Sequence, residues 1–142
     1  MLFNEIAIKT VEAYDKGALS FFEALRDIPF EIKRIYYIHS AGGGVARGGH
    51  AHKALQQFLF CPYGDIEITL NDGKNVKSYT LSNPTKGLYI PCGVWRDMIW
   101  RLEKSVLCVA ASDYYDESDY IRDWNIFKSM LADNYWSNKH DS

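Results

Sequence analysis

Two histidines separated by a single residue are the first candidates for chemistry in this sequence. His50 and His52 follow a glycine-rich segment that contains Arg47. Residues two apart on a β-strand point to the same side, so both imidazoles would enter one cavity. A neutral imidazole, with an ordinary pKa of about 6.5, accepts a proton well at physiological pH. The pattern favours a site for acid–base chemistry over its alternative, a structural pair on a wet surface.

The same stretch resembles the first motif of the cupin superfamily. That motif is a glycine, five residues, His-x-His, three or four residues, a glutamate, six residues and a glycine. The chain matches it at Gly44, His50, His52 and Gly64, with Gln57 in place of the glutamate. The second motif, Pro-x-Gly-x-x-His, is matched by residues 91–96, with Arg96 in place of the histidine. The resemblance implies a small jelly-roll β-barrel.

The two departures from the cupin motifs argue against a metal. A metal-dependent cupin uses both histidines, the glutamate and the last histidine as ligands. Here the last two positions hold the neutral amide of Gln57 and the guanidinium of Arg96. A guanidinium has no free lone pair and is permanently positive, so it opposes a divalent cation. We expect no metal and no cofactor; the alternative is that His39 or Cys61 completes a metal site.

Without a metal, the cavity suits anion binding and proton transfer. A guanidinium group binds a phosphate through two parallel hydrogen bonds, and its charge stabilises a developing enolate. Arg47 and Arg96 are therefore candidates for phosphate binding and for enolate stabilisation. A histidine base with such arginines is typical of an isomerase or epimerase that acts on a phosphorylated carbonyl compound.

Four longer blocks resemble the sugar-nucleotide 3,4-ketoisomerase family. They are residues 29–38, 47–53, 87–91 with Trp95, and 111–122. The resemblance implies a metal-free homodimer that converts dTDP-4-keto-6-deoxyglucose to its 3-keto isomer, in the biosynthesis of 3-amino-3,6-dideoxysugars. One departure is near the start of the chain, where Lys16 replaces an arginine that family members tend to carry.

The resemblance also implies roles for individual residues. His52 is expected to remove the C3 proton of the sugar, His50 to orient the sugar oxygens, and Tyr37 to donate or relay a proton. A register slip of one residue would exchange Tyr37 for Tyr36. The expected substrate-binding residues are Arg34 and Arg47 for the diphosphate, Arg96 near the hexose, and Gln57 and Trp95. The alternative for Arg34 is a surface cation.

Three other functions are also compatible with these residues. A sugar-nucleotide 3,5-epimerase uses related chemistry on a related substrate, a non-catalytic cupin would bind a sugar without turnover, and a cupin oxygenase would need a metal.

The elements that must position these residues are β-strands. Short segments rich in β-branched and aromatic residues recur from Glu5 to about Ser112, separated by turn residues, which is typical of an all-β sandwich or barrel. Within 32–38, even-numbered residues share one face and odd-numbered residues the other. The alternating residues 66–70, the Asp-Gly turn at 71–74 and the segment 76–81 predict a hairpin.

The C-terminal part changes character. The aromatic and acidic block 113–122 is interpreted as a loop that caps one end of the barrel. Ser118 is a plausible N-cap, and the large apolar residues beyond it are spaced by three and four. This pattern predicts an amphipathic helix over about 118–132.

Composition limits the remaining possibilities. The chain has 142 residues, 47% of them hydrophobic, which fits a single domain over 1–142. Its 16 Lys and Arg against 18 Asp and Glu lack the basic excess of a nucleic-acid binder. No apolar run approaches the roughly 20 residues of a membrane span, and no secretion signal is visible. We therefore expect a cytoplasmic protein with neither nucleic acid nor membrane as partner.

Overall fold

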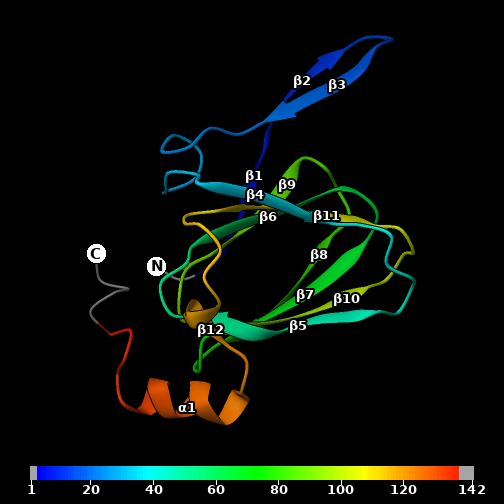
Figure 1. The fold of residues 1–142 in the computed structure, drawn as a ribbon. Helices are drawn as coiled ribbons and strands as arrows, with labels where there is room; N and C mark the ends of the chain where they lie inside the picture. The colour runs from blue at the N-terminus through cyan, green and yellow to red at the C-terminus, as the bar shows by residue number, and fades with distance from the viewer. Residues whose placement is uncertain (1–2, 138–142) are drawn as a thin grey trace.

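Two five-stranded antiparallel sheets face each other in the computed structural model, which describes residues 3–137 (Figure 1). The first sheet is made, in spatial order, of β1 (Asn4–Ala7), β9 (Lys86–Ile90), β6 (Gln57–Tyr63), β11 (Val106–Ala111) and β4 (Arg34–Ile38). The second is made of β12 (Tyr120–Ile121), β5 (Ala46–His52), β10 (Trp95–Trp100), β7 (Ile66–Asn71) and β8 (Val76–Leu81). Residues 1–2 and 138–142, parts of the predicted domain span, lie outside the described residues.

The predicted all-β jelly roll with a C-terminal helix is confirmed. Over residues 3–137 the two sheets share no strand ladder, so the barrel is a two-layer sandwich rather than a closed cylinder. The predicted hairpin is also confirmed, because Ile66 pairs with Leu81 and Asn71 with Val76.

The main core lies between the sheets and follows from period-two alternation. Ile66, Ile68 and Leu70 point inward and are fully buried, whereas the residues between them are only partly buried. Alternate residues of β6, β10 and β11 do the same: Leu59, Cys61, Met98, Trp100, Leu107 and Val109. At one end of the sandwich this apolar filling gives way to polar side chains.

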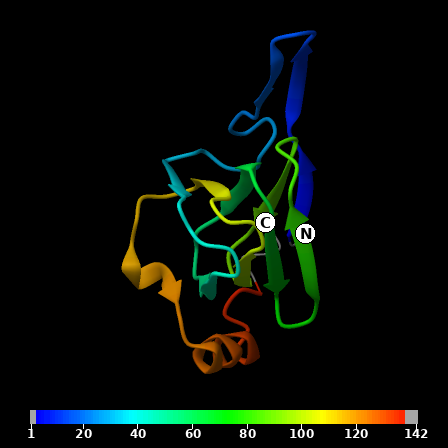
Figure 2. The same ribbon diagram turned by 90° about the vertical axis from the view of Figure 1, so that its right-hand side faces the viewer.

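A second apolar cluster covers the outer face of the first sheet. It contains Phe58 and Phe60 of β6 together with Phe22 and Phe30 from the segment before β4. Next to this cluster a separate hairpin, β2 (Lys9–Ala13) and β3 (Gly17–Phe21), projects away from the sandwich (Figure 2).

The C-terminal helix begins later than predicted. Helix α1 runs Trp124–Ala132, and its N-cap is Asp123, whose carboxylate accepts the backbone N–H of Asn125 and Ile126. The prediction is wrong before Trp124. Ser118 lies in a short 3₁₀ turn, η1 (Glu117–Asp119), and β12 follows it because its backbone pairs with β5.

Helix α1 is held to the second sheet by aromatic packing. Phe127 is buried against the rings of Trp95, Trp124 and Trp136, with centroids 5.4–5.6 Å away. The Trp136 indole N–H donates to the Lys53 carbonyl at 2.9 Å, which holds the segment after the helix to the residue that follows β5. In the described part of the chain no helix has the length and apolar content to span a bilayer.

Phe127→Ala is expected to destabilise the fold by about 3–5 kcal/mol, because it empties the space between three indoles. The measurement is the free energy of unfolding in urea. Lys128→Ala, at an exposed position of the same helix, is the control and is expected to change stability by less than about 0.5 kcal/mol. Equal losses in both variants would contradict this packing.

Candidate active site

Polar side chains from four strands meet between the sheets, at the end of the sandwich where the apolar core stops. His50 and His52 come from β5, Arg96 from β10, Gln57 from β6 and Tyr36 from β4. Arg96 stands directly opposite His50 in the ladder between β10 and β5, so the two side chains share a face. The cluster joins both sheets.

A glycine bulge in β5 sets the position of the histidines. The ladder between β5 and β10 shifts register at Arg96 and Asp97, where Gly48 and Gly49 have φ values of +90° and +69°. A Cβ on Gly48 would lie 2.9 Å from the Arg96 carbonyl oxygen. Only glycine fits this backbone at low cost, which explains the glycines before the His-x-His pair.

The histidine pair is neutral at neutral pH. The two rings lie 5.0 Å apart at 85°, and His52 is fully buried. Burial, with the nearby Arg96 charge, lowers the pKa of His50 to about 3. Burial likewise lowers the pKa of His52 to about 4, although its hydrogen bond to Asp119 opposes the shift. Both imidazoles therefore carry a free lone pair and can accept a proton.

A chain of hydrogen bonds crosses the site from Arg96 to Tyr36. The Arg96 guanidinium donates to the Gln57 side-chain oxygen and, at 3.2 Å, to the Val94 carbonyl. Since a guanidinium can only donate, the Gln57 oxygen must face it, and the amide nitrogen faces the Tyr36 hydroxyl at 3.0 Å. The Tyr36 oxygen is then an acceptor, which leaves its own proton available for another partner.

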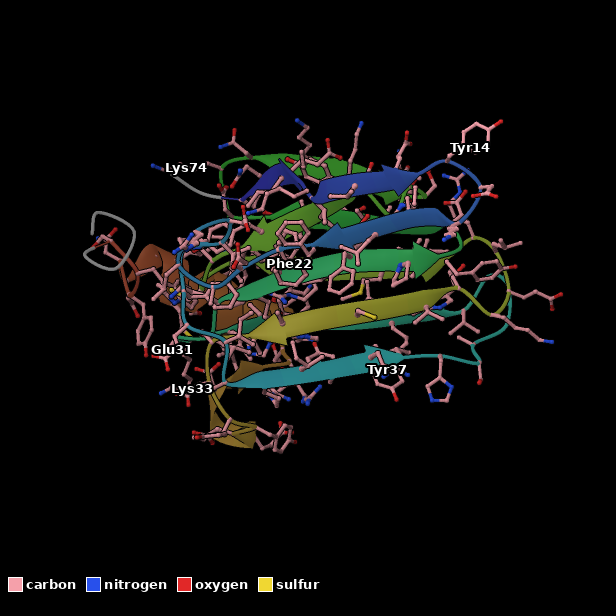
Figure 3. All side chains as sticks on the ribbon, turned by 90° about the horizontal axis from the view of Figure 1, so that it is seen from above. Tyr14, Phe22, Glu31, Lys33, Tyr37 and Lys74 are labelled. Atoms are coloured by element: carbon pink, nitrogen blue, oxygen red, sulfur yellow. The ribbon has the colours of Figure 1, made fainter. Side chains whose placement is uncertain are left out.

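The prediction of Tyr37 as the site tyrosine is wrong. Tyr37 is 63% exposed on the outer face of the first sheet (Figure 3), whereas its neighbour Tyr36 points inward to Gln57. Successive residues of a strand point to opposite faces, so one step of register decides between them. In the ladder Tyr36 is opposite Val109, a core residue, which fixes that register.

The prediction of Trp95 as a substrate-binding residue is also wrong. Trp95 precedes Arg96 on β10 and therefore points to the other face of the second sheet. There its ring packs on Trp124 and Phe127 of α1, 5.3 and 5.6 Å away. Because adjacent residues of a strand point to opposite faces, the position of Trp95 next to Arg96 in the sequence does not bring its side chain to the site.

The two other predicted arginines differ in their relation to the site. Arg34 is half-buried between the rings of Tyr36 and Tyr115, at 5.1 and 5.6 Å, so it is not a free surface cation. It lines a cavity of about 170 Å³ together with His52. Arg47 is opposite Met98 in the ladder, but its side chain is exposed and does not line that cavity.

A segment that we call the strap, residues 113–122, closes the outer edge of β5. Its Tyr120 ring lies 4.4 Å from the ring of His52 and 5.1 Å from that of His50. Its Asp119 carboxylate accepts a hydrogen bond from His52 Nδ1 at 3.0 Å. Sequence reasoning missed both residues, because a helix over 118–132 would have carried them away from β5. The 111–122 block was the one signal that pointed to them.

Metal ligands are not gathered in this cavity. Among residues 3–137, no group of three or more His, Cys, Asp or Glu side chains could hold a metal ion. Cys61 is buried in the apolar core and donates to the Tyr63 carbonyl, while exposed His39 pairs with Ser40. The alternative in which either of them completes a metal site is therefore wrong.

Fold and site together define a cupin-type protein with a buried acid–base cluster. Residues 3–132 match the family model described as "FdtA: WxcM-like, C-terminal", and the chain belongs to this family. It is 44% identical over 117 residues to a TDP-4-oxo-6-deoxy-alpha-D-glucose-3,4-oxoisomerase from Aneurinibacillus thermoaerophilus, covering 82% of this chain and 84% of that one.

Solved structures of 3,4-ketoisomerases have the same fold. A His-to-Asn mutant of QdtA from Thermoanaerobacterium thermosaccharolyticum, in complex with TDP-4-keto-6-deoxyglucose, is 39% identical with a TM-score of 0.88, over 93% of this chain and 95% of that one. A 3,4-ketoisomerase from Helicobacter canadensis is 42% identical with a TM-score of 0.87, over 92% and 97%.

Gln57→Leu is expected to destabilise the protein by about 3 kcal/mol, because the buried Arg96 charge loses an acceptor. Gln57→Glu keeps an acceptor and is expected to lose less than about 1 kcal/mol. Guanidinium chloride unfolding measures both. Equal losses would mean that the Arg96 contact contributes nothing to stability.

Proposed function

We propose that this protein is an isomerase that converts dTDP-4-keto-6-deoxyglucose to its 3-keto isomer, for the biosynthesis of 3-amino-3,6-dideoxysugars. The observation that carries the proposal is a pair of neutral, buried imidazoles in one cluster with Arg96 and a hydrogen-bonded Tyr36. The family's 3,4-ketoisomerases support the choice of substrate.

The first step is removal of the C3 proton. The C4 ketone acidifies this proton, and His52 accepts it through Nε2, which is buried and without a hydrogen-bond partner in the described part of the chain. The C–H electron pair forms the C3–C4 double bond, and the C4 oxygen becomes an enediolate oxygen. The positive charge of Arg96 stabilises that oxygen.

The second step places a proton on C4. The Tyr36 hydroxyl, whose oxygen already accepts from Gln57, is free to donate to the C4 oxygen. The Tyr36 hydroxyl proton passes to the C4 oxygen, and the phenolate left on Tyr36 takes the C3 hydroxyl proton. The electron pair released at the C3 oxygen forms the C3 ketone, and the electron pair of the C3–C4 double bond takes the proton that the His52 imidazolium returns at C4. His50 orients the sugar oxygens. Two protons, one from C3 and one from its hydroxyl, thus move to C4 and its oxygen, so the isomerisation is redox-neutral and calls for no cofactor.

Binding of the nucleotide sugar is assigned to the open side of the cavity. The diphosphate is a bidentate acceptor; Arg34 supplies a guanidinium group in the cavity, and the exposed Arg47 on β5 is assigned to the same task. Arg96, deeper and fully buried, faces the hexose. The thiols of Cys61 and Cys108 fit a reducing compartment, so we assign the enzyme to the cytoplasm.

A homodimer is part of the same proposal. The β2–β3 hairpin projects from the sandwich and exposes Val11 and Leu19, and the outer face of β4 exposes Ile35 and Tyr37. The hairpin and β4 lie at the same end of the molecule in Figure 1, and their exposed apolar residues favour coverage by a second copy. Lys16 is at the hairpin tip, between β2 and β3, remote from the histidines of its own chain.

Incubation with dTDP-4-keto-6-deoxyglucose in D₂O, followed by NMR, tests the activity. The ketone is expected to move to C3, with deuterium appearing at C4. Deuterium at C3 and C5 with the ketone still at C4 would identify a 3,5-epimerase instead. Binding without any exchange at C3 would leave a non-catalytic sugar-binding cupin.

Two tyrosine variants test the role of the Tyr36 hydroxyl, with Tyr37→Phe as the control for Tyr36→Phe. Tyr36→Phe is expected to lower kcat by about 10²–10⁴-fold, as for loss of a general acid. Tyr37→Phe removes the same atom from the outer face and is expected to keep kcat. His52→Asn is expected to abolish exchange of the C3 proton, and full turnover in this variant would overturn the catalytic account.

The dimer is tested by light scattering after size exclusion. A mass of about twice 16.3 kDa is expected. Replacing both Val11 and Leu19, which face each other across the hairpin, with aspartate is expected to give the monomer. Val76→Asp, at an equally exposed apolar site of the other sheet, is the control and should stay dimeric. A wild-type monomer would contradict the proposal.

A further inference from the structure

We propose that Asp119 is the positioning residue of His52: it fixes the imidazole tautomer that leaves Nε2 as the proton acceptor. The inference rests on the proposed isomerase function and adds a residue from outside the cupin motifs. Asp119 reaches His52 from the strap, which crosses the edge of β5 opposite the histidine.

The geometry of the carboxylate leaves one assignment for the protons. Asp119 Oδ2 lies 3.0 Å from His52 Nδ1. Asp119 Oδ1 accepts the Ala54 N–H at 2.8 Å, and Oδ2 also accepts the Leu55 N–H at 3.3 Å. An ionised carboxylate only accepts hydrogen bonds, so His52 Nδ1 must carry the ring proton. The lone pair is then on Nε2, the atom that has no hydrogen-bond partner in residues 3–137.

Asp119 remains ionised in this position. Burial alone would raise its pKa, but the hydrogen bonds from His52 and from the Ala54 and Leu55 backbone outweigh burial and lower the pKa. The carboxylate is thus available as an acceptor throughout the neutral range.

The strap clamps Asp119 from both sides. On the N-terminal side, the Asp116 carboxylate caps η1 by accepting from the Ser118 N–H at 3.0 Å. At Asp119 itself, the backbone carbonyl accepts the Lys53 N–H at 2.9 Å, and the next residue, Tyr120, pairs with His52 in the ladder. The backbone bonds on either side of the carboxylate leave little freedom for it to turn from His52, as positioning of a catalytic base requires.

A tautomer switch would remove the base without removing the histidine. With the proton on Nε2, the atom that faces the substrate would donate a hydrogen bond rather than accept a proton. Holding an imidazole in the wrong tautomer costs a catalytic site orders of magnitude in rate. Asp119 therefore affects kcat through His52 and needs no contact with the sugar.

In Asp119→Asn, the backbone N–H groups of Ala54 and Leu55 determine which way the new amide group points. The asparagine oxygen is needed by the Ala54 N–H, the shorter of the two backbone contacts, so the amide NH₂ turns to His52. The NH₂ group donates to Nδ1, and the ring proton is forced onto Nε2. We expect kcat to fall by about 10²–10⁴-fold with a smaller change in KM.

In Asp119→Asn, the direction in which the pKa of His52 changes distinguishes loss of the carboxylate charge in a folded protein from loss of the strap structure. The charged or titratable groups that face His52 are His50 on β5, Arg96 on β10, Arg34 on β4, Asp119 in η1 and Tyr120 on β12. Asp119 is the one among them whose charge raises the pKa of His52, since the two arginines lower it. Its neutralisation in a folded protein lowers the pKa of His52 below about 4. A strap that came loose would instead expose His52 and raise its pKa toward about 6.5.

The experiment compares wild type, Asp119→Asn and Asp116→Asn, each labelled with ¹⁵N-histidine. Asp116→Asn is the matched control, because it removes a carboxylate from the same strap and cavity while its amide oxygen can still cap η1. Long-range ¹H–¹⁵N spectra report the tautomer, an NMR titration reports the pKa of His52, and the D₂O assay reports kcat.

The expected result is a protonated Nδ1 in wild type and in Asp116→Asn, and a protonated Nε2 with a lowered His52 pKa and low kcat in Asp119→Asn. An unchanged tautomer or an unchanged kcat in Asp119→Asn would overturn the inference. So would a His52 pKa that rises toward about 6.5. The tautomer is read without substrate, so failure of the isomerase proposal, seen as an inactive wild type, is distinguishable from failure of the Asp119 inference.

Discussion

The burial of one permanent positive charge organises the polar end of the sandwich. Arg96 is 1% exposed, and a guanidinium in that position must find acceptors inside the protein. It takes the oxygens of Gln57 and Val94, and burial lowers its pKa to about 10 while leaving it charged at neutral pH. The same charge disfavours protonation of both histidines and fixes which way the Gln57 amide points. The acidity of the histidines and the direction of the Gln57 hydrogen bonds both depend on this charge.

The strands and the strap both place side chains around Arg96 and the histidines. Period-two alternation on β4, β5, β6 and β10 points five polar side chains inward at the level where the apolar core ends. The strap then adds a second set from the outside edge of β5, where Asp119 and Tyr120 meet His52. His52 therefore has different surroundings at its two nitrogens: an ionised carboxylate at Nδ1, and no hydrogen-bond partner within residues 3–137 at Nε2. An imidazole with this asymmetry acts as a base with a defined direction.

The cupin motifs explain why the site could be located from the sequence and why part of it could not. Gly48, Gly49 and the His-x-His pair are adjacent in the chain, so local backbone geometry relates them to one another. Gln57 and Arg96 occupy motif positions and were found by comparison with the motifs. Tyr36 and Trp95 depend on strand register and facing, which a one-residue shift reverses. Asp119 lies 67 positions from His52 and belongs to a segment that reads as a helix start.

The sequence by itself determined the all-β class, the β7–β8 hairpin, the histidine pair and the replacement of two metal-ligand positions by an amide and a guanidinium. These features depend on residue type and short-range spacing. Tertiary structure decided that Tyr36 rather than Tyr37 faces the cavity, that Trp95 supports the helix, and that the strap reaches the histidines. Each of these depends on which strand or loop lies beside another, and backbone pairing between distant segments overrides local propensity. Ser118 shows this: its capping potential is real, but pairing of the next residues with β5 places the helix start at Asp123.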